Sequence, residues 1–217
     1  MSLAIFDLDN TLLGGDSDYL WGQFLVEQGL VDGEHYEREN QRFYEAYEAG
    51  TLDIGQYQAF MLRPLAGRPL SELRAWREQF MAEKIQPILL PKAEELLNRH
   101  RRAGDSLLII TATNRFITTP IAERLGVSHL LATEPEVVEG LYTGRTVGIP
   151  CFQQGKVARL NAWLADTGSD LADSWFYSDS HNDLPLLKQV TYPVAVDPDA
   201  TLARHAQAQG WPVISLR

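Results

Sequence analysis

Short apolar segments, each ending at or next to a polar residue, recur along the chain. The first reads Leu-Ala-Ile-Phe and is followed directly by Asp7. Runs of this length are typical of strands buried in a parallel sheet, because helices are usually longer. We therefore predict strands in the segments of this kind, which occupy residues 3–6, 106–111, 174–177, 192–196 and 212–214. The last of them should lie at an edge of the sheet.

Helical patterns separate these strands. Between Pro91 and Gly104 the apolar positions recur on one helical face, and these two residues suit a helix start and a helix end. Apolar stripes of the same period lie around Ile121 and around Leu160. Residues 137–147 have instead the pattern of a small β-hairpin. The alternation of strands and helices predicts an α/β fold whose core is a doubly wound, parallel, Rossmann-like sheet.

A long segment after the first strand interrupts this alternation. From residue 16 to residue 86 no strand-like run occurs, and aromatic residues such as Tyr36 and Phe43 recur at helical spacing. We predict a helical cap over residues 16–86, inserted into a core that consists of residues 1–15 and 87–217.

The composition indicates a folded, acidic protein. Hydrophobic residues make up 45% and charged residues 22%, which is typical of globular chains. With 19 Lys and Arg against 29 Asp and Glu, the net charge of −10 argues against nucleic acid or an anionic membrane as a partner. The single cysteine, Cys151, has no partner for an intramolecular disulfide. No secretory pattern or membrane-spanning run is visible, so we expect a cytoplasmic protein.

Asp7 and Asp9 follow the first strand as Asp-Leu-Asp. Two carboxylates that point the same way repel each other unless a cation or a shared proton compensates. Mg²⁺ prefers such oxygen ligands and keeps waters that a phosphate can share. One carboxylate could then attack phosphorus, and the other could serve as acid and base. The alternative is a turn in which aspartate favours the loop conformation.

Three further residues could hold a phosphate. The hydroxyl of Thr111, at the end of the second strand, can donate to a phosphate oxygen, as can following backbone amides such as that of Ala112. Thr111 could instead cap a helix. Lys156 follows a glycine at the start of a predicted helix, where a cation is mildly unfavourable unless it faces an anion. A solvated lysine is the alternative.

Asp179 and Asp183 follow the third strand in Ser-Asp-Ser-His-Asn-Asp. Asp179 could join Asp7 on a metal ion. Asp183 could hold a metal-bound water or orient Lys156, or it could cap a helix near Pro185.

Taken together, these residues resemble the motifs of the haloacid dehalogenase superfamily of phosphatases. Residues 6–12, Phe-Asp-Leu-Asp-Asn-Thr-Leu, are similar to its first motif. Matches to the second, third and fourth motifs follow in family order at Thr111, Lys156, and Asp179 with Asp183. The resemblance spans essentially the whole chain, and the helical insertion resembles the cap of the phosphoserine-phosphatase-like branch.

This resemblance implies a set of roles. Asp7 would be the nucleophile and Asp9 the acid and base. Mg²⁺ would be held by the carboxylates of Asp7 and Asp179 and by the backbone carbonyl of Asp9. Thr111 and Lys156 would hold the phosphoryl oxygens. Haloacid dehalogenases proper lack the second acid, so Asp9 favours phosphate chemistry.

The cap should decide the substrate, a small phosphomonoester. Asp16 lies where phosphoserine phosphatases carry a glutamate that meets the substrate ammonium, which favours an amino-bearing substrate such as phosphoserine or histidinol phosphate. Residues 113–118 differ from the Ser-Gly-Gly type of phosphoserine phosphatases, so histidinol phosphate is favoured. Asp16 could instead cap the first cap helix.

Several alternatives remain open at this point. Three arginines of the cap could bind a substrate carboxylate or could be solvated, namely Arg38, Arg42 and Arg63. The aromatic residues of the cap could form its core or a cage around the substrate. A phosphotransferase or mutase could use the same core. A non-enzymatic interaction module would be expected to lose Asp7, Asp9 or Lys156, and none is lost. The sequence indicates no oligomeric state.

Overall fold

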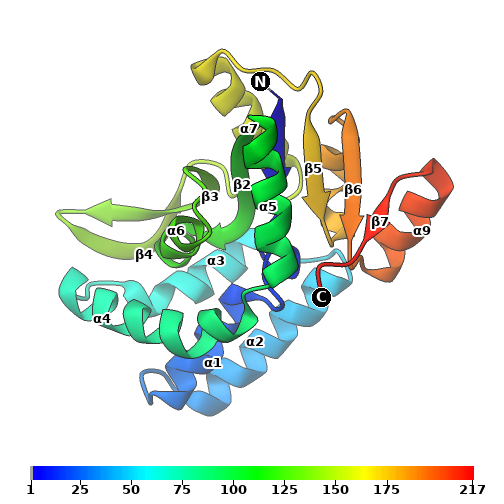
Figure 1. Cartoon of the computed structure of the whole chain (residues 1–217). Helices are drawn as coiled ribbons and strands as arrows, with labels where there is room; N and C mark the ends of the chain where they lie inside the picture. Colours follow the sequence, from blue (N-terminus) through cyan, green and yellow to red (C-terminus); the bar gives the residue numbers. More distant parts are fainter. Residues whose placement is uncertain (1) are drawn as a thin grey trace.

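A seven-stranded sheet forms the centre of the molecule (Figure 1). The structure, a computed structural model, describes residues 2–217. The strand order is β4-β3-β2-β1-β5-β6-β7, and all neighbours are parallel except β3 and β4. The strands are β1 (Leu3–Phe6), β2 (Ser106–Asn114), β3 (His129–Val138), β4 (Leu141–Val147), β5 (Trp175–Ser178), β6 (Tyr192–Val196) and β7 (Val213–Ile214). The predicted α/β fold class is confirmed.

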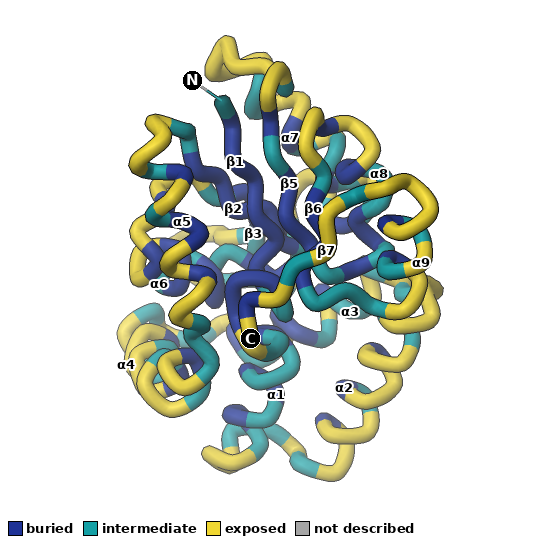
Figure 2. The backbone as a smooth tube through the Cα atoms, turned by 45° about the vertical axis from the view of Figure 1, so that its right-hand side comes forward, coloured by how far each residue is buried: buried dark blue, intermediate teal, exposed yellow. Residues whose placement is uncertain are grey.

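Helices cover both faces of this sheet. Along β1, Leu3 and Ile5 belong to one apolar cluster, whereas Ala4 and Phe6 belong to another. A parallel strand is buried on both faces, which explains why it reads as a continuous apolar run. Figure 2 shows β1 buried along its length. The covering helices are α5 (Pro91–Ala103) and α6 (Arg115–Arg124) on one face, and α7 (Gln154–Thr167), α8 (Leu184–Leu187) and α9 (Ala200–Gln209) on the other.

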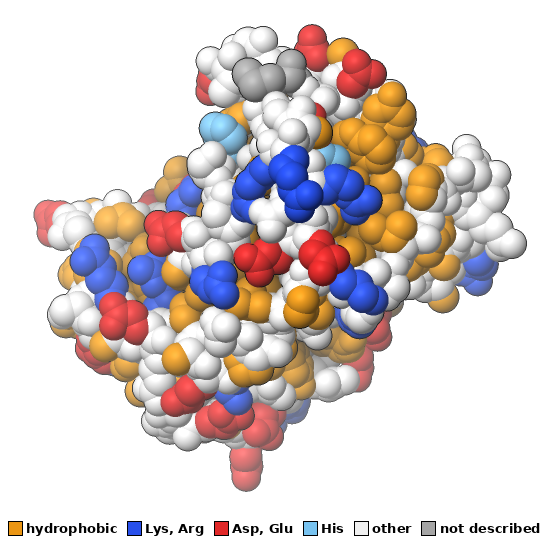
Figure 3. Space-filling view, viewed as in Figure 1, with side chains coloured by type: hydrophobic (Ala, Val, Ile, Leu, Met, Phe, Trp, Pro, Cys, Tyr) orange, Lys and Arg blue, Asp and Glu red, His pale blue; other side chains and the backbone are white. Residues whose placement is uncertain are grey.

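The face of the sheet against which α5 packs is only partly covered by helices. Basic side chains gather over α5, and beside them hydrophobic side chains reach the surface over β5 and β6 (Figure 3). Tyr192 is stacked on Trp175 there, with ring centroids 4.4 Å apart, and is 40% exposed.

The segment between β1 and α5 contains helices and no named strand among the described residues. These are α1 (Ser17–Glu27), α2 (Gly33–Glu48), α3 (Ile54–Leu62) and α4 (Leu70–Phe80), followed by a π-helical turn at Met81–Ile85. Short 3-10 turns lie at Arg63–Leu65, Gln86–Ile88 and His181–Asp183. A division into cap and core near residues 16 and 86 stays a prediction.

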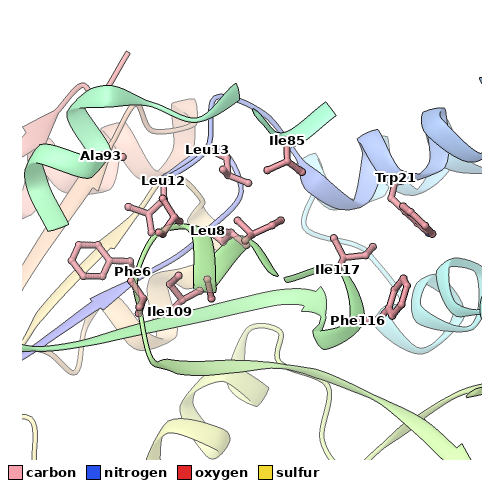
Figure 4. Close-up of a cluster of buried hydrophobic side chains, with 14 of the residues drawn as sticks. Phe6, Leu8, Leu12, Leu13, Trp21, Ile85, Ala93, Ile109, Phe116 and Ile117 are labelled. Carbon is pink, nitrogen blue, oxygen red and sulfur yellow. The ribbon is translucent and has the colours of Figure 1, made fainter. Parts of the chain in front are cut away.

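The two segments that lead into and out of these helices lie side by side. The backbone N–H of Gly14 donates to the carbonyl of Ile88 at 2.8 Å, and Leu13 forms an antiparallel bridge with Leu89. The helices also share an apolar cluster with the sheet. Trp21 of α1 packs edge-on against Phe116 of α6, at a centroid distance of 5.9 Å (Figure 4).

The hairpin prediction was incomplete. Residues 129–138 form one long strand, which pairs in parallel with β2 in its first half and antiparallel with β4 in its second half. The first half was missed because its apolar core, Leu-Leu-Ala at residues 130–132, is too short to stand out between polar neighbours. β2 also extends three residues beyond the predicted end at Thr111, to Asn114.

Candidate active site

The carboxyl ends of three central strands meet at one place. β1 lies between β2 and β5, because the chain crosses from β1 to one side and later returns to the other. Such a change of direction opens a crevice beyond the strand ends of a parallel sheet. Asp7 directly follows β1, Thr111 lies in the last part of β2, and Asp179 directly follows β5. Three distant segments thus contribute side chains to the same crevice.

Lys156 joins two buried aspartates. Its Nζ donates to Oδ1 of Asp7 at 2.7 Å and to Oδ2 of Asp183 at 2.8 Å. Ser178 Oγ donates to the same Asp183 oxygen at 2.7 Å. A solvated lysine is excluded, because Lys156 is 4% exposed. Asp183 does occupy the N-cap position of α8, but its carboxylate makes no capping hydrogen bond and binds Lys156 instead.

Burial and neighbouring charges have opposite effects on the pKa values of Asp7 and Lys156. Burial raises the pKa of Asp7 to about 7, although the positive charge of Lys156 acts in the opposite direction. Burial alone lowers the pKa of Lys156, but the Asp183 and Asp7 carboxylates more than compensate and hold it above its usual range. Lys156 is therefore a cation at any physiological pH, whereas Asp7 titrates near neutrality.

Both oxygens of Asp9 are held by hydrogen bonds. The backbone N–H of Ser17 donates to Oδ1 at 2.7 Å, and Thr113 Oγ1 donates to Oδ2 at 2.8 Å. Burial, and next the Asp16 charge, raise the pKa of Asp9 to about 6, so it can give up and regain a proton near neutral pH. Sequence reasoning missed Ser17 and Thr113. Thr113 could have been found, because it stands two residues after Thr111 on an extended strand.

Asp179 is tied to the first loop through Thr11. Thr11 Oγ1 donates to Asp179 Oδ1 at 3.1 Å and accepts from the Asp179 backbone N–H at 3.1 Å. Burial, and next the Asp7 charge, raise the pKa of Asp179 well above its usual range. No Lys, Arg or His within residues 2–217 forms an ion pair with this carboxylate. The described side chains therefore supply no positive charge to balance the ionised form of Asp179.

The predicted phosphate-binding positions of β2 lie where its pairing with β3 is irregular. Thr111 and Ala112 both line the cavity described below. The Ala112 carbonyl accepts hydrogen bonds from Gln58 Nε2 at 3.0 Å and from Thr133 Oγ1 at 2.8 Å. Thr111 does not cap the following helix, because Asn114 occupies the cap position and its side chain accepts the capping hydrogen bond.

Gly155 allows α7 to approach the preceding loop closely. A Cβ on this residue would lie 2.0 Å from the carbonyl oxygen of Pro150, a distance that no side chain could occupy. Gly155 and Lys156 both lie in the first turn of α7, which begins at Gln154. The missing side chain thus lets this turn dock where Lys156 can reach the strand ends.

A cavity of about 50 Å³ lies between the strand ends and helices α1 to α3. Asp16 lines it and also caps α1, since its carboxylate accepts a hydrogen bond from the Tyr19 N–H at 2.9 Å. The two roles that the sequence presented as alternatives are therefore compatible. Asp18 also lines the cavity and is 2% exposed. Sequence reasoning missed it, because an acidic residue in the first turn of a helix is ordinary.

The arginines considered for a substrate carboxylate do not line the cavity. Arg38, Arg42 and Arg63 are exposed, and Arg42 pairs with Glu39 at 2.8 Å. Among the described residues, Lys156 is the single Lys or Arg in the cavity wall.

The aromatic residues of this region divide between two places. Tyr44 and Tyr57 line the cavity, whereas Trp21 and Phe24 are fully buried in the apolar cluster and Phe60 packs against it.

Comparison with known proteins identifies the family. The model of the haloacid dehalogenase-like hydrolases matches residues 4–188. A histidinol-phosphatase of Neisseria meningitidis is 46% identical and is covered over 99% of its length by 100% of this chain. A phosphoserine phosphatase of Mycobacterium tuberculosis is 32% identical, with 99% of this chain and 70% of the relative covered. The chain therefore belongs to the haloacid dehalogenase-like hydrolase family, and it is a phosphatase.

Solved structures agree on the fold. A protein of unknown function from Bordetella pertussis superposes with a TM-score of 0.93 at 48% identity, covering 100% of this chain and 99% of its own. A phosphoserine phosphatase with an analogue of a phospho-aspartyl intermediate superposes with a TM-score of 0.72 at 18% identity, covering 100% of this chain and 93% of its own. The fold is thus that of the phosphoserine-phosphatase-like branch, as the sequence predicted.

Within residues 2–217, none of the helices has both the length and the apolar character needed to cross a membrane.

Proposed function

We propose that this chain hydrolyses the phosphate ester of a small amino alcohol, with histidinol phosphate as its substrate. The observation that carries this choice is the charge of the cavity wall. Its one Lys or Arg, Lys156, is already bound to Asp7 and Asp183. A substrate carboxylate, such as that of phosphoserine, would find no second cation there. Histidinol phosphate has no carboxylate, and a histidinol-phosphatase shares 46% identity with this chain.

Asp16 supplies the complementary feature, a carboxylate for the substrate ammonium. It faces the cavity beside Asp9, and burial raises its pKa above the usual range. An ammonium group would bring positive charge to this place and make a charge-assisted hydrogen bond to the carboxylate.

Asp7 acts as the nucleophile in this proposal. Its carboxylate oxygen attacks phosphorus while the bond from phosphorus to the alcohol oxygen breaks, and Asp9 gives its proton to that oxygen. In the second step Asp9 takes a proton from water, and the water oxygen attacks phosphorus as the aspartyl-phosphate bond breaks. The products are phosphate and the free alcohol, and both aspartates return to their starting state. Lys156 and Thr111 hold the phosphoryl oxygens, together with the backbone amide of Ala112.

The donor set near Asp7 fits Mg²⁺. The carboxylates of Asp7 and Asp179 and the backbone carbonyl of Asp9 would hold the ion. Within residues 2–217, no group of three or more His, Cys, Asp or Glu side chains is arranged to hold a metal by itself. Such a sparse protein ligand set suits Mg²⁺, which keeps several waters and shares phosphate oxygens. The ion would neutralise the charge that develops on the transferred phosphoryl group. Asp183 would act indirectly, by holding Lys156.

The proposal is tested by phosphate release from histidinol phosphate and phosphoserine in the presence of Mg²⁺. Histidinol phosphate should have the higher kcat/KM by about a hundredfold or more, because an unpaired carboxylate in the cavity costs several kcal/mol. Asp16→Asn should lower kcat/KM for histidinol phosphate by about tenfold to a hundredfold, the worth of one charge-assisted hydrogen bond.

Asp32→Asn is the matched control for Asp16→Asn. Asp32 also caps a helix of this region, α2, through the His35 N–H at 2.9 Å, but it is exposed and lies outside the cavity wall. A preference for phosphoserine, or no release from either ester, would overturn the assignment. Analysis of the products with an added acceptor alcohol would show whether the phosphoryl group passes to an alcohol instead of water.

A further inference from the structure

The cavity holds one carboxylate more than the proposed chemistry and the substrate ammonium require. Asp7, Asp9 and Asp183 take part in the reaction or hold Lys156, and Asp16 faces the ammonium. Asp18 has neither role, yet it lines the same cavity and is 2% exposed. A buried carboxylate is costly unless a group of opposite charge or a hydrogen-bond donor meets it.

The protein partners of Asp18 are neutral. Asn114 Nδ2 donates to Asp18 Oδ1 at a long distance of 3.4 Å, and the Tyr57 hydroxyl lies near enough to act on the pKa of this carboxylate, which it lowers. No Lys, Arg or His among residues 2–217 forms an ion pair with Asp18. Burial, and next the charges of Asp16 and Asp9, raise its pKa well above the usual range. The ionised form of Asp18 thus has no counter-charge from the described residues.

Aromatic rings form the wall around this carboxylate. Tyr19 and Tyr44 lie with ring centroids 5.9 Å apart, and Phe43 and Tyr57 lie 5.3 Å apart, and all four line the cavity. Faces of aromatic rings attract cations and flat rings that carry N–H groups. The wall therefore suits a flat, nitrogen-bearing group better than a simple aliphatic chain.

A second polar side chain in the same wall is also incompletely paired. Asn40 is 5% exposed and lines the cavity. Its Nδ2 donates to the Tyr19 carbonyl at 3.3 Å, whereas its side-chain oxygen accepts no hydrogen bond from the described residues. This oxygen is not one of the fully buried unpaired atoms of the described residues, so it is open to a hydrogen-bond donor on the ligand.

We propose that Asp18, with Tyr57, recognises a second nitrogen-bearing group on the alcohol part of the substrate, separate from the ammonium that Asp16 binds. This rests on the proposed function, and for histidinol phosphate the group is the imidazole ring. A ring N–H donates to Asp18, and the ring lies against the aromatic wall. Imidazole has a pKa of about 6.5 in water, so a nearby carboxylate favours its charged form at neutral pH. The alcohol part of the substrate then places its ammonium beside Asp16 and its charged ring beside Asp18.

The experiment compares two substrates that differ in the ring alone. Histidinol phosphate and phenylalaninol phosphate share the amino alcohol and the ester, but the phenyl ring has no nitrogen. The quantity measured is the ratio of their kcat/KM values. Asp18→Asn should lower this ratio by about tenfold to a hundredfold, because one charge-assisted hydrogen bond is lost for one substrate only. Asp16→Asn should lower both kcat/KM values and leave the ratio within about threefold.

Two further measurements keep the test decisive if Asp18→Asn folds poorly. Tyr57→Phe removes the hydroxyl beside Asp18 and keeps the ring, and it should lower the same ratio by about threefold to tenfold. Binding of the product histidinol, followed by calorimetry, should be tighter than that of phenylalaninol in the wild type. Asp18→Asn or Tyr57→Phe should remove most of this difference, whereas the control Asp32→Asn should keep it.

The outcomes separate this inference from the proposed function. An unchanged ratio in both variants, with the wild type still hydrolysing histidinol phosphate, would overturn the role of Asp18 and leave the proposed function standing. A wild type that does not hydrolyse histidinol phosphate would overturn both.

Discussion

Lys156 Nζ lies 2.7 Å from Oδ1 of Asp7, although 149 residues separate the two in the chain. The pair is buried at the point where β1 ends and α7 begins, and Asp183 binds the same ammonium group. Removing one member of such a buried group leaves uncompensated charge, so these residues affect stability as well as activity.

Asp7→Asn should abolish turnover while the protein stays folded. An amide is a poor nucleophile, so the loss should exceed about a thousandfold, or roughly 4 kcal/mol of transition-state stabilisation. Phosphate release and circular dichroism together check this. Asp53→Asn is the control, because Asp53 is an exposed helix cap on α3. Turnover close to the wild-type rate in Asp7→Asn would rule out Asp7 as nucleophile.

Activity should depend on Mg²⁺. EDTA should remove activity and added Mg²⁺ should restore it, because Lys156 alone cannot balance the ionised carboxylates of Asp7, Asp183 and Asp179. Ca²⁺ should be a poor substitute, since its larger and more flexible coordination would misplace the nucleophile and the phosphate. Steady-state phosphate release after exhaustive chelation is the measurement. Full activity in the chelated protein would contradict the metal site.

The metal-free protein should be more stable at pH 5 than at pH 8. Burial raises the pKa of Asp7 to about 7 and that of Asp9 to about 6, whereas both are near 3.8 when unfolded. At pH values between the unfolded and the folded pKa values, the folded state binds more protons than the unfolded state. The free energy of unfolding therefore falls as the pH rises through this range and levels off above a pH of about 7.

Urea unfolding in EDTA measures this dependence. The free energy of unfolding should fall by roughly 4 kcal/mol between the two pH values, and Asp7→Asn should reduce that fall. A protein that is equally stable at both, or more stable at pH 8, would show that these carboxylates are not held in their protonated form.

Gly155→Ala should impair both folding and catalysis. The added Cβ would lie 2.0 Å from the Pro150 carbonyl oxygen, so α7 must shift and carry Lys156 with it. We expect a loss of about 2 to 4 kcal/mol in stability and at least a tenfold fall in kcat/KM.

Gly55→Ala is the matched control. Gly55 lies in the first turns of α3, and a Cβ there would meet its nearest atom at an ordinary 3.4 Å. Alanine should be neutral or stabilising there, by up to about 1 kcal/mol. Equal behaviour of the two variants would show that the close approach at Gly155 does not position Lys156.

The strongest sequence signals were local ones. β1 could be predicted because a strand buried on both faces must be apolar throughout, and Asp7 stood out because it ends such a run. β3 was predicted only in part, because it changes from a parallel to an antiparallel partner along its length. Its burial pattern therefore changes with the partner, and no single period describes it.

The sequence by itself determined the α/β class, the family and the order of the motifs, because each of these is written in short runs of neighbouring residues. Only the tertiary structure determined which charged side chains lie next to one another. Lys156 could have been solvated, and Asp16 could have been only a helix cap, until the strand order and the packing of α1 placed both against one cavity. Asp18 carried no signal, because its burial depends on helices that pack around it from elsewhere in the chain. The free energy of a buried charge depends on distances between remote segments, and the fold alone sets those distances.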